Sequence, residues 1–443
     1  MDARTAVIRE LREAALGAFR AALDAVDPGR LLGAAVGRTG DGRITVAGLE
    51  VPRARGRVVV AAVGKAAGPL AAGWLRHVPV PPETLFVLAP HGAPVPGEAG
   101  RSAIVRRGSH PEPDAAGEAA TLELLELAAG LGPGDLLVVL LSGGASALLA
   151  APEPPATLED VRAVTRALLR AGAPIGALNA VRRWLLRAAG GGLARTAAPA
   201  RVLGLVLSDV PGDPLPDIGS GPTVPSPTPP SAALAVLERY GVLGEVPERA
   251  VRVLRRLEAE RAAAADREAA VARTALLGGN RTAVAAAADW LRGAGYGVWT
   301  PQRPLTGEAS VRGRQLGALA GAFAPREPFA AVFGGETTVT VRGNGSGGRN
   351  HELALAAAIE LADGPPRVVL AAGTDGVDGT SGAAGALADP GTAARLRAAG
   401  IDPREALLRN DSGPAMAAAG DAVVTGPTGT NVADLTLLLA AEP

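Results

Sequence analysis

The chain has 443 residues, enough for two or three domains, and its 48% hydrophobic and 20% charged content is ordinary for a globular protein. A net charge of zero and 2% aromatic residues argue against a nucleic-acid-binding protein, which favours basic surfaces and stacking rings. The absence of cysteine excludes disulfides, thiol nucleophiles and cysteine-ligated metal sites.

Helix and strand patterns alternate along the first half of the chain. Apolar residues at helical spacing predict helices at 3–26, 115–129 and within 157–189. Short runs rich in valine and leucine predict strands at 58–63, 85–88, 136–141 and 202–207. Such alternation indicates a parallel α/β sheet with crossover helices, which binds ligands at the carboxyl ends of its strands.

The second half begins with a helical stretch, residues 231–272, which is interpreted as a connection. We expect a second unit to start with a strand at 274–277 and a helix. We expect a hairpin at 332–341, a glycine-rich loop, a helix at 351–362 and a strand at 368–372 to follow.

Lys65 is the most unusual position, because it is the only lysine among 44 lysine and arginine residues. An ammonium group on a flexible stem can meet a phosphate or carboxylate end-on, which a planar guanidinium does less well. Gly64-Lys65 follows the predicted strand at 58–63 and precedes a small-residue helix, an arrangement that suits anion binding. A surface lysine without a role is the alternative, and the placement favours a functional one.

Two further loops follow predicted strands. Ser142-Gly143-Gly144, with Ser146, forms a strand-to-helix turn whose N–H groups could hold an anion, or a simple tight turn. Asp209 and Asp213 lie on a proline-containing loop, where two carboxylates would suit Mg²⁺ together with phosphate oxygens. Aspartate also caps turns and helices, so a structural role is the alternative.

The loop at 342–350 contains G-x-G-x-x-G, ending at Gly348, which by itself is a weak indication of a dinucleotide site. Arg349 follows these glycines and would offer a forked phosphate ligand. Asp375 and Asp378 follow the strand at 368–372. Their spacing partly matches a calcium-binding loop, but the terminal glutamate of an EF-hand is missing, so we exclude an EF-hand. The loop at 425–431 is either a turn or a phosphate cradle.

Asparagine marks further candidate positions, because only six occur and each lies in or beside a glycine- or aspartate-rich loop. They are Asn179, Asn280, Asn344, Asn350, Asn410 and Asn431. Many small hydroxyl and glycine loops, one lysine, one embedded arginine and several aspartates fit phosphoryl transfer, where the protein mainly positions groups and neutralises charge.

These motifs resemble the class II glycerate kinases, in family order over nearly the whole chain. The matching blocks are GKAA at 64–67, GSHPEPD at 108–114, LSGGAS at 141–146, LSDVPGD at 207–213, SGPTVPSPT at 220–228, GGETTVTVRGNGSGGRNHELALA at 334–356, GTDGVDG at 373–379, NDS at 410–412 and TGPTGTNVADL at 425–435.

The resemblance implies an ATP- and Mg²⁺-dependent glycerate 2-kinase made of two α/β domains. They would be a Rossmann-like parallel-sheet domain over residues 1–245 and a smaller mixed-sheet MOFRL domain over 246–443, with the active site in the cleft between them. Glycerate and ATP would be its partners, and we expect a cytoplasmic monomer or homodimer with no membrane or nucleic-acid partner.

The resemblance also implies the catalytic residues Lys65, Arg349 and Asp375. We assign Asp209 and Asp213 to the metal as our own inference. The predicted substrate- and nucleotide-binding residues are Gly64, Ser142, Gly143, Gly144, Ser146, Asn280, Glu336, Gly348, Asn350, Thr428 and Asn431.

Four positions depart from the family pattern. Ala189 and Ser346 stand where lysines are usual, Trp184 replaces a histidine, and His351 replaces a glutamine. Two other functions stay open. One is a hydroxypyruvate reductase using NAD(P)H, which the G-x-G-x-x-G motif would support, and the other is a sugar-acid-binding paralogue without catalysis.

Overall fold

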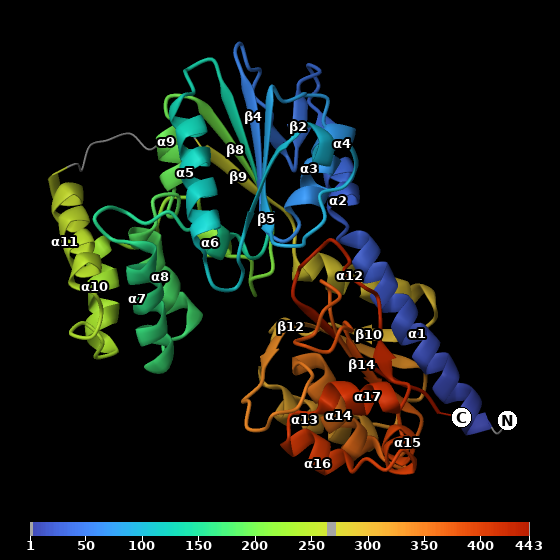
Figure 1. Ribbon diagram of the computed structural model, residues 1–443. Coiled ribbons are helices and arrows are strands. Elements are labelled where there is room, and N and C mark those ends of the chain that lie inside the picture. Colours follow the sequence, from blue (N-terminus) through green and yellow to red (C-terminus); the bar gives the residue numbers. More distant parts are fainter. Residues whose placement is uncertain (1–2, 264–271, 443) are drawn as a thin grey trace. The chain divides into compact units, whose positions relative to one another are not determined.

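The computed structural model describes residues 3–263 and 272–442, and the chain divides into two compact units. Pro28–Leu277 form one unit, called here the Lys65 unit. Met1–Asp27 and Gly278–Pro443 together form the other, called here the Arg349 unit. Both are α/β units, as predicted (Figure 1).

The Lys65 unit contains a six-stranded sheet in the order β6-β5-β4-β7-β8-β9. The pairs β4–β5, β5–β6, β4–β7 and β7–β8 are all parallel. The chain builds outward from β4 in one direction and then returns to build outward in the other, which is the strand order of doubly wound nucleotide-binding folds. The strands are β4 (Val58–Val63), β5 (Thr84–Pro90), β6 (Ile104–Gly108), β7 (Leu136–Leu141), β8 (Arg201–Leu207) and β9 (Ala272–Gly278).

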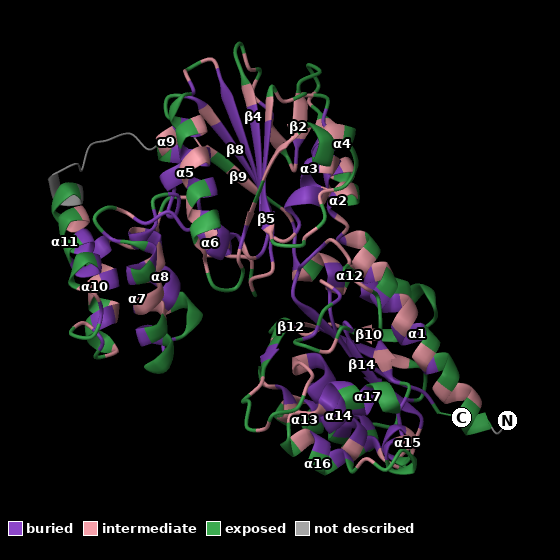
Figure 2. Ribbon diagram, viewed as in Figure 1, coloured by how far each residue is buried: buried purple, intermediate pink, exposed green. Residues whose placement is uncertain are grey.

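Helices cover both faces of this sheet. Figure 1 shows α3 (Ala67–His77) and α4 (Gly97–Ser102) on one side, and α5 (Ala115–Ala129) and α9 (Gly192–Ala197) on the other. The central strands β4, β5, β7 and β8 are almost wholly buried, as Figure 2 shows, because both of their faces lie against helices, whereas the edge strands β6 and β9 are partly exposed.

A separate group of helices in the same unit has its own core, which includes Leu168, Val181, Leu237 and Leu254. Its helices are α7 (Leu158–Arg170), α8 (Ile175–Leu185), α10 (Pro230–Arg239) and α11 (Glu248–Ala263). The other elements of the unit are α2 (Pro28–Ala35), α6 (Ala145–Leu148), the short 3₁₀ helix η1 (Ile218–Ser220), and a small antiparallel sheet of β1 (Val36–Arg38), β2 (Ile44–Val46) and β3 (Leu49–Glu50).

The Arg349 unit has a mixed sheet in the order β10-β12-β16-β13-β14-β15, with β11 also paired to β12. Strand β12 runs parallel to β10 and β11, whereas its pairing with β16 and all later pairings are antiparallel. The strands are β10 (Gly297–Trp299), β11 (Leu305–Glu308), β12 (Phe329–Thr338), β13 (Arg367–Gly373), β14 (Gly385–Ala388), β15 (Ala422–Val423) and β16 (Asp434–Ala440). The predicted mixed sheet is confirmed.

The tightest helix pair in this unit is α13 against α14. A side-chain carbon at Gly313 would lie 2.1 Å from the Leu353 carbonyl oxygen, so glycine is what allows the two backbones to approach. The helices of the unit are α1 (Ala3–Ala25), α12 (Asn280–Gly293), α13 (Ala309–Ala322), α14 (Arg349–Leu361), α15 (Thr392–Ala398), α16 (Pro403–Leu408) and α17 (Ser412–Ala418).

The division of the chain differs from the expected boundary at 245/246. Helix α1 packs on α12 in the Arg349 unit, while α10 and α11 pack with α7 and α8 in the Lys65 unit. The strand expected to open the second unit is β9, which completes the first sheet. These differences arise because packing partners far apart in the chain, such as α1 and α12, leave no local sequence pattern.

Two other expectations are also revised. The hairpin expected at 332–341 is wrong, because residues 332–338 belong to one continuous strand, β12, which lies between β10 and β16. Part of the helical connection predicted at 231–272, residues 264–271, lies outside the described residues. Within the described ranges, we find no helix both long and apolar enough to cross a lipid bilayer.

Arg12 attaches α1 to the rest of the Arg349 unit. Its guanidinium donates to Asp389 and, over 2.8 Å, to Asp421, two carboxylates whose side chains are only 3% and 1% exposed. Burial by itself would raise the pKa of Asp389, but hydrogen bonds from Arg395 and the charges of Arg395 and Arg12 lower it.

We therefore expect Arg12→Ala to destabilise the Arg349 unit by about 1–3 kcal/mol, because it removes one cation from two buried carboxylates. Arg9→Ala is the matched control on the same helix, since Arg9 is exposed and lies 3.9 Å from Glu13; it should change stability by less than about 0.5 kcal/mol. Denaturant unfolding followed by circular dichroism measures both, and equal stability of the two variants would contradict the anchoring role of Arg12.

Candidate active site

In the Lys65 unit, the predicted residues gather where the strand order reverses, between β4 and β7. Ligands of doubly wound sheets bind in the crevice at this point, outside the carboxyl ends of the strands. Lys65 follows β4 after a single residue, and the turn Ser142-Gly143-Gly144 follows β7 directly. The predicted lysine turn and the predicted glycine turn are thus neighbours.

Gly64 allows the two turns to touch. Its φ is +120°, and a side-chain carbon there would lie 2.3 Å from Ser142 Oγ. The Lys65 N–H donates to the Gly143 carbonyl over 2.8 Å, and the Ala66 N–H donates to Ser142 Oγ over 3.0 Å. Ser142 is fully buried, so its hydroxyl serves this turn-to-turn contact.

The Lys65 side chain runs beside Gly144. A side-chain carbon at Gly144, whose φ is +84°, would lie 3.3 Å from Lys65 Cγ and 3.0 Å from His110 Cδ2. The loop after β6 therefore brings His110 to the same place. His110 belongs to the GSHPEPD block, and sequence analysis gave it no role.

A cavity of about 560 Å³ lies beside these turns within the Lys65 unit. Gly144, Ser146 and Asp209 line it, so two predicted binding residues and one predicted metal ligand share it. The Ser146 hydroxyl is 2.9 Å from the Ser220 hydroxyl. The remaining lining comes from the loop after β6, from α7 and α8, and from the loop after β8.

The second predicted metal ligand, Asp213, lies on the loop after β8. Its φ is +56°, its N–H donates to the Val210 carbonyl over 3.0 Å, and its buried Oδ1 has no hydrogen-bond partner among the described residues. Across the described ranges, no group of three or more histidine, aspartate or glutamate side chains is arranged to hold a metal. An unpartnered carboxylate oxygen still suits a cation that takes its other ligands from phosphate and water.

In the Arg349 unit, Arg349 is tightly held by carboxylates. Its Nε and Nη2 donate to Asp434 over 2.5 and 2.8 Å, and its Nη1 lies 3.0 Å from Glu336 Oε1. Burial by itself would lower the pKa of Arg349, but the hydrogen bonds and charge of Asp434, with the charge of Glu336, raise it. A phosphate would therefore have to compete with two carboxylates for this guanidinium.

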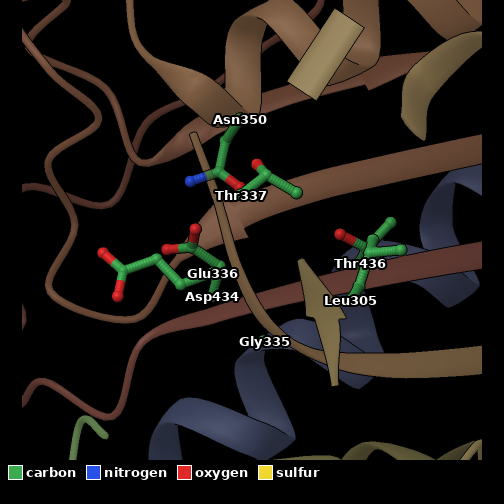
Figure 3. A pocket seen from close by; sticks show the side chains of 7 residues that line it. All are labelled: Leu305, Gly335, Glu336, Thr337, Asn350, Asp434 and Thr436. Carbon is green, nitrogen blue, oxygen red and sulfur yellow. The ribbon is translucent and has the colours of Figure 1, made fainter. Parts of the chain in front are cut away.

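Strand pairing brings these acids together. Gly335 on β12 pairs with Asp434 on β16, so the next residue, Glu336, lies near Asp434; Figure 3 shows the two carboxylates, together with Asn350. A side-chain carbon at Gly373 would lie 3.2 Å from Asp375 Oδ1 and 3.3 Å from Asp434 Oδ1. The predicted catalytic Asp375 is thus beside Asp434, which sequence analysis did not single out although it lies in a family block.

The glycine-rich loop at 342–348 does not offer a free cradle of N–H groups. Asn410 Oδ1 accepts from residues 342 and 343, the Arg409 carbonyl accepts from residue 345, and Asp411 Oδ1 accepts from residue 346, at 2.7–3.0 Å. The glycines are needed because a side-chain carbon at 343 or 345 would lie 2.2 or 2.6 Å from the Arg409 carbonyl oxygen. The loop is packed against the protein itself.

Asp378 occupies the N-terminus of α14. Its carboxylate accepts from the Asn350 and His351 N–H groups over 3.1 and 2.8 Å, and lies 2.6 Å from the His351 ring nitrogen Nδ1. A helix N-terminus attracts an anion, and here a protein carboxylate supplies it. Asn350 and the preceding Gly348, both predicted to bind nucleotide, therefore lie beside Asp378.

The other predicted residues of this unit hold the backbone leading into β16. Asn280 Nδ2 donates to the carbonyls of Val432 and Asp434 over 2.8 and 3.0 Å. Thr428 Oγ1 donates to the Thr374 carbonyl over 2.6 Å, and Asn431 Oδ1 accepts from the Ala433 N–H over 3.3 Å. These contacts position Asp434 for Arg349.

Comparison with known proteins agrees with this architecture. Residues 14–255 match a family described as a domain of unknown function, DUF4147, and residues 329–434 match the MOFRL family. The chain is 39% identical to the D-glycerate 2-kinase of Thermotoga maritima over 74% of this chain and 77% of that one. It is 33% identical to the glycerate 2-kinase of Pyrococcus horikoshii over 98% and 99% of the two chains.

Two further similarities bear on function. The crystal structure of glycerate kinase from Thermotoga maritima superposes with a TM-score of 0.84 at 34% identity, covering 98% of this chain and 100% of that one. A protein of Agrobacterium vitis, named as a candidate hydroxypyruvate reductase, is 40% identical over 93% of both chains.

The doubly wound Lys65 unit and the Arg349 unit, which contains the MOFRL region, together define a two-unit α/β protein of the glycerate kinase class. The chain belongs to the class II glycerate kinase family, through its DUF4147 and MOFRL regions and its glycerate kinase relatives.

Glu352 provides a pH test of the Arg349 unit. It is buried and accepts a 2.9 Å hydrogen bond from Asn410 Nδ2, and burial raises its pKa above the ordinary 4.5. Between the unfolded and folded pKa values the folded state binds more protons, so stability falls as pH rises through this window.

Glu352→Gln stays neutral and should escape this loss, so the stability of the variant relative to the natural chain should increase from pH 4 to pH 7. Urea unfolding at several pH values measures the difference. Glu360→Gln, at an exposed position of the same helix, is the control. A pH-independent difference for Glu352→Gln would show that the carboxylate is not destabilised by burial.

Proposed function

We propose that this protein is a glycerate 2-kinase, which transfers the γ-phosphoryl group of ATP to the 2-hydroxyl of D-glycerate. The observation that carries the proposal is the chain's single lysine, placed at the switch point of a doubly wound sheet and fixed there by the β7 turn. The glycerate 2-kinase relatives support the substrate assignment, since they cover up to 98% of this chain.

In the proposed reaction, the 2-hydroxyl oxygen of glycerate forms a bond to the γ-phosphorus as the bond from that phosphorus to the β-phosphate bridging oxygen breaks, releasing ADP. Lys65 neutralises charge on the transferring group, which is the main task of a phosphotransferase. Arg349 is a second cation for this purpose. Asp375 accepts the proton of the substrate hydroxyl.

Mg²⁺ is part of the proposal, as the usual companion of ATP, whose phosphate charge it shields. Asp209 and Asp213 would hold it, and the unpartnered Oδ1 of Asp213 supports this assignment. We further propose a cytoplasmic enzyme acting as a monomer or homodimer.

The names of the Agrobacterium relatives favour hydroxypyruvate reductase as a second candidate. Two observations oppose it. A dinucleotide-binding fold of this strand order carries its glycine fingerprint after the first strand, where this chain has Gly64-Lys65-Ala66-Ala67-Gly68. The G-x-G-x-x-G that does occur has three of its six N–H groups bound to the 409–411 segment.

A coupled assay of ADP release across small hydroxy acids tests the proposal. We expect turnover with D-glycerate and a product that enolase accepts directly, which identifies 2-phosphoglycerate. NAD(P)H oxidation with hydroxypyruvate, without ADP release from glycerate and ATP, would support the reductase. Calorimetric binding of glycerate without either reaction would support a non-catalytic paralogue.

Lys65→Ala should lower kcat by about three orders of magnitude or more, because charge on the transferring group loses its main cation. Circular dichroism and Tm should stay close to those of the natural chain, since the backbone N–H groups of Lys65 and Ala66 hold this turn against the β7 turn. Arg76→Ala, in the last turn of the helix that follows, is the control and should keep normal activity. Near-normal turnover of Lys65→Ala would remove the lysine from the mechanism.

A further inference from the structure

The cavity in the Lys65 unit is larger than a three-carbon acid requires. Its volume of about 560 Å³ lies in the range of roughly 300–1,000 Å³ typical of sites for drug-sized ligands. Gly144, beside the Lys65 stem, contributes to its lining, as do α7 and α8. The residues that line it all come from the Lys65 unit.

The α7–α8 part of the lining is apolar. Leu169 lies in the last turn of α7 and Ile175 begins α8, and these residues are 59% and 65% exposed, whereas Leu178, also in the lining, is buried. Large aliphatic side chains exposed along the wall of a cavity provide a surface on which a flat aromatic group can pack. Sequence analysis did not predict this surface, because its residues come from two helices.

The polar part of the lining contains three carboxylates (Glu112, Asp209 and Asp217) and three arginines, which differ in their partners. Arg162 is hydrogen-bonded to the Pro113 carbonyl over 2.9 Å, and Arg166 donates to Glu159. Arg182 has neither a hydrogen bond nor an ion pair within the described ranges, and burial lowers its pKa. A partly desolvated cation without a counter-ion is costly, and an anionic ligand would remove that cost.

We propose that this cavity binds the nucleoside triphosphate, with its base against Leu169 and Ile175 and its phosphate tail on Arg182. The proposal rests on the kinase function proposed above and specifies which part of the chain holds the nucleotide. A polyanion joined to a flat base matches both parts of the lining, whereas glycerate offers only a carboxylate and hydroxyls. Arg182 is therefore a nucleotide-binding residue, with its ligand oriented toward the Lys65 turn.

The test measures binding of ATP with Mg²⁺ by isothermal titration calorimetry in the absence of glycerate, and the KM of each substrate. Arg182→Ala should raise the Kd and KM for ATP about ten- to hundredfold, as loss of a charge-assisted hydrogen bond does, and leave the KM for glycerate within about twofold. Arg182→Lys should recover part of the affinity.

Ile175→Glu tests the apolar wall without a folding risk, since Ile175 is exposed at the first position of α8, where an acidic residue favours the helix. It should weaken ATP binding by at least about fivefold, because a carboxylate would face the base and repel the phosphates. Arg170→Ala is the matched control, as Arg170 is exposed and 3.8 Å from Glu245; it should leave ATP binding unchanged.

Unchanged ATP affinity in Arg182→Ala would overturn the proposal. A raised KM for glycerate alone would also overturn it and would indicate that the cavity binds glycerate. Failure of the natural chain to bind ATP would also overturn it. The proposed function fails in a different way: ATP would bind, and Arg182→Ala would weaken it, but glycerate would not be phosphorylated.

Discussion

The close approach of the β4 and β7 turns is the constraint on which the chemistry of the Lys65 unit depends. Gly64 touches Ser142, and only a residue without a side chain fits there. Backbone hydrogen bonds from Lys65 and Ala66 to the β7 turn then fix the start of the lysine side chain before any ligand is bound. A cation preorganised in this way would lose less freedom on binding a phosphate group.

The Arg349 unit uses its glycines in a different way. Its glycine-rich loop accommodates the Arg409 carbonyl instead of a ligand, and the N-terminus of α14 already holds Asp378. Arg349 is likewise saturated by Asp434 and Glu336. These contacts hold one guanidinium among several carboxylates. To act as a cation for phosphate, Arg349 would have to exchange a carboxylate partner for the phosphate.

The role of each arginine in this chain depends on its surroundings. Arg12 and Arg349 neutralise buried carboxylates, which stabilises a fold but leaves little charge for a ligand. Arg182 faces a cavity without a partner within the described ranges. A guanidinium without a carboxylate partner contributes most to the free energy of binding an anionic ligand, because the ligand replaces no existing ion pair.

The sequence by itself determined the α/β class, the strands β4, β7 and β8, the family, and the prominence of Lys65, because apolar runs, turn glycines and a unique residue are local signals. Tertiary structure alone decided that α1 belongs with α12, that β9 completes the first sheet, that Asp434 meets Arg349, and that α7 and α8 wall a cavity around Arg182. Those facts depend on contacts between segments distant in the chain, and no local pattern of residues encodes which distant partner a side chain will find.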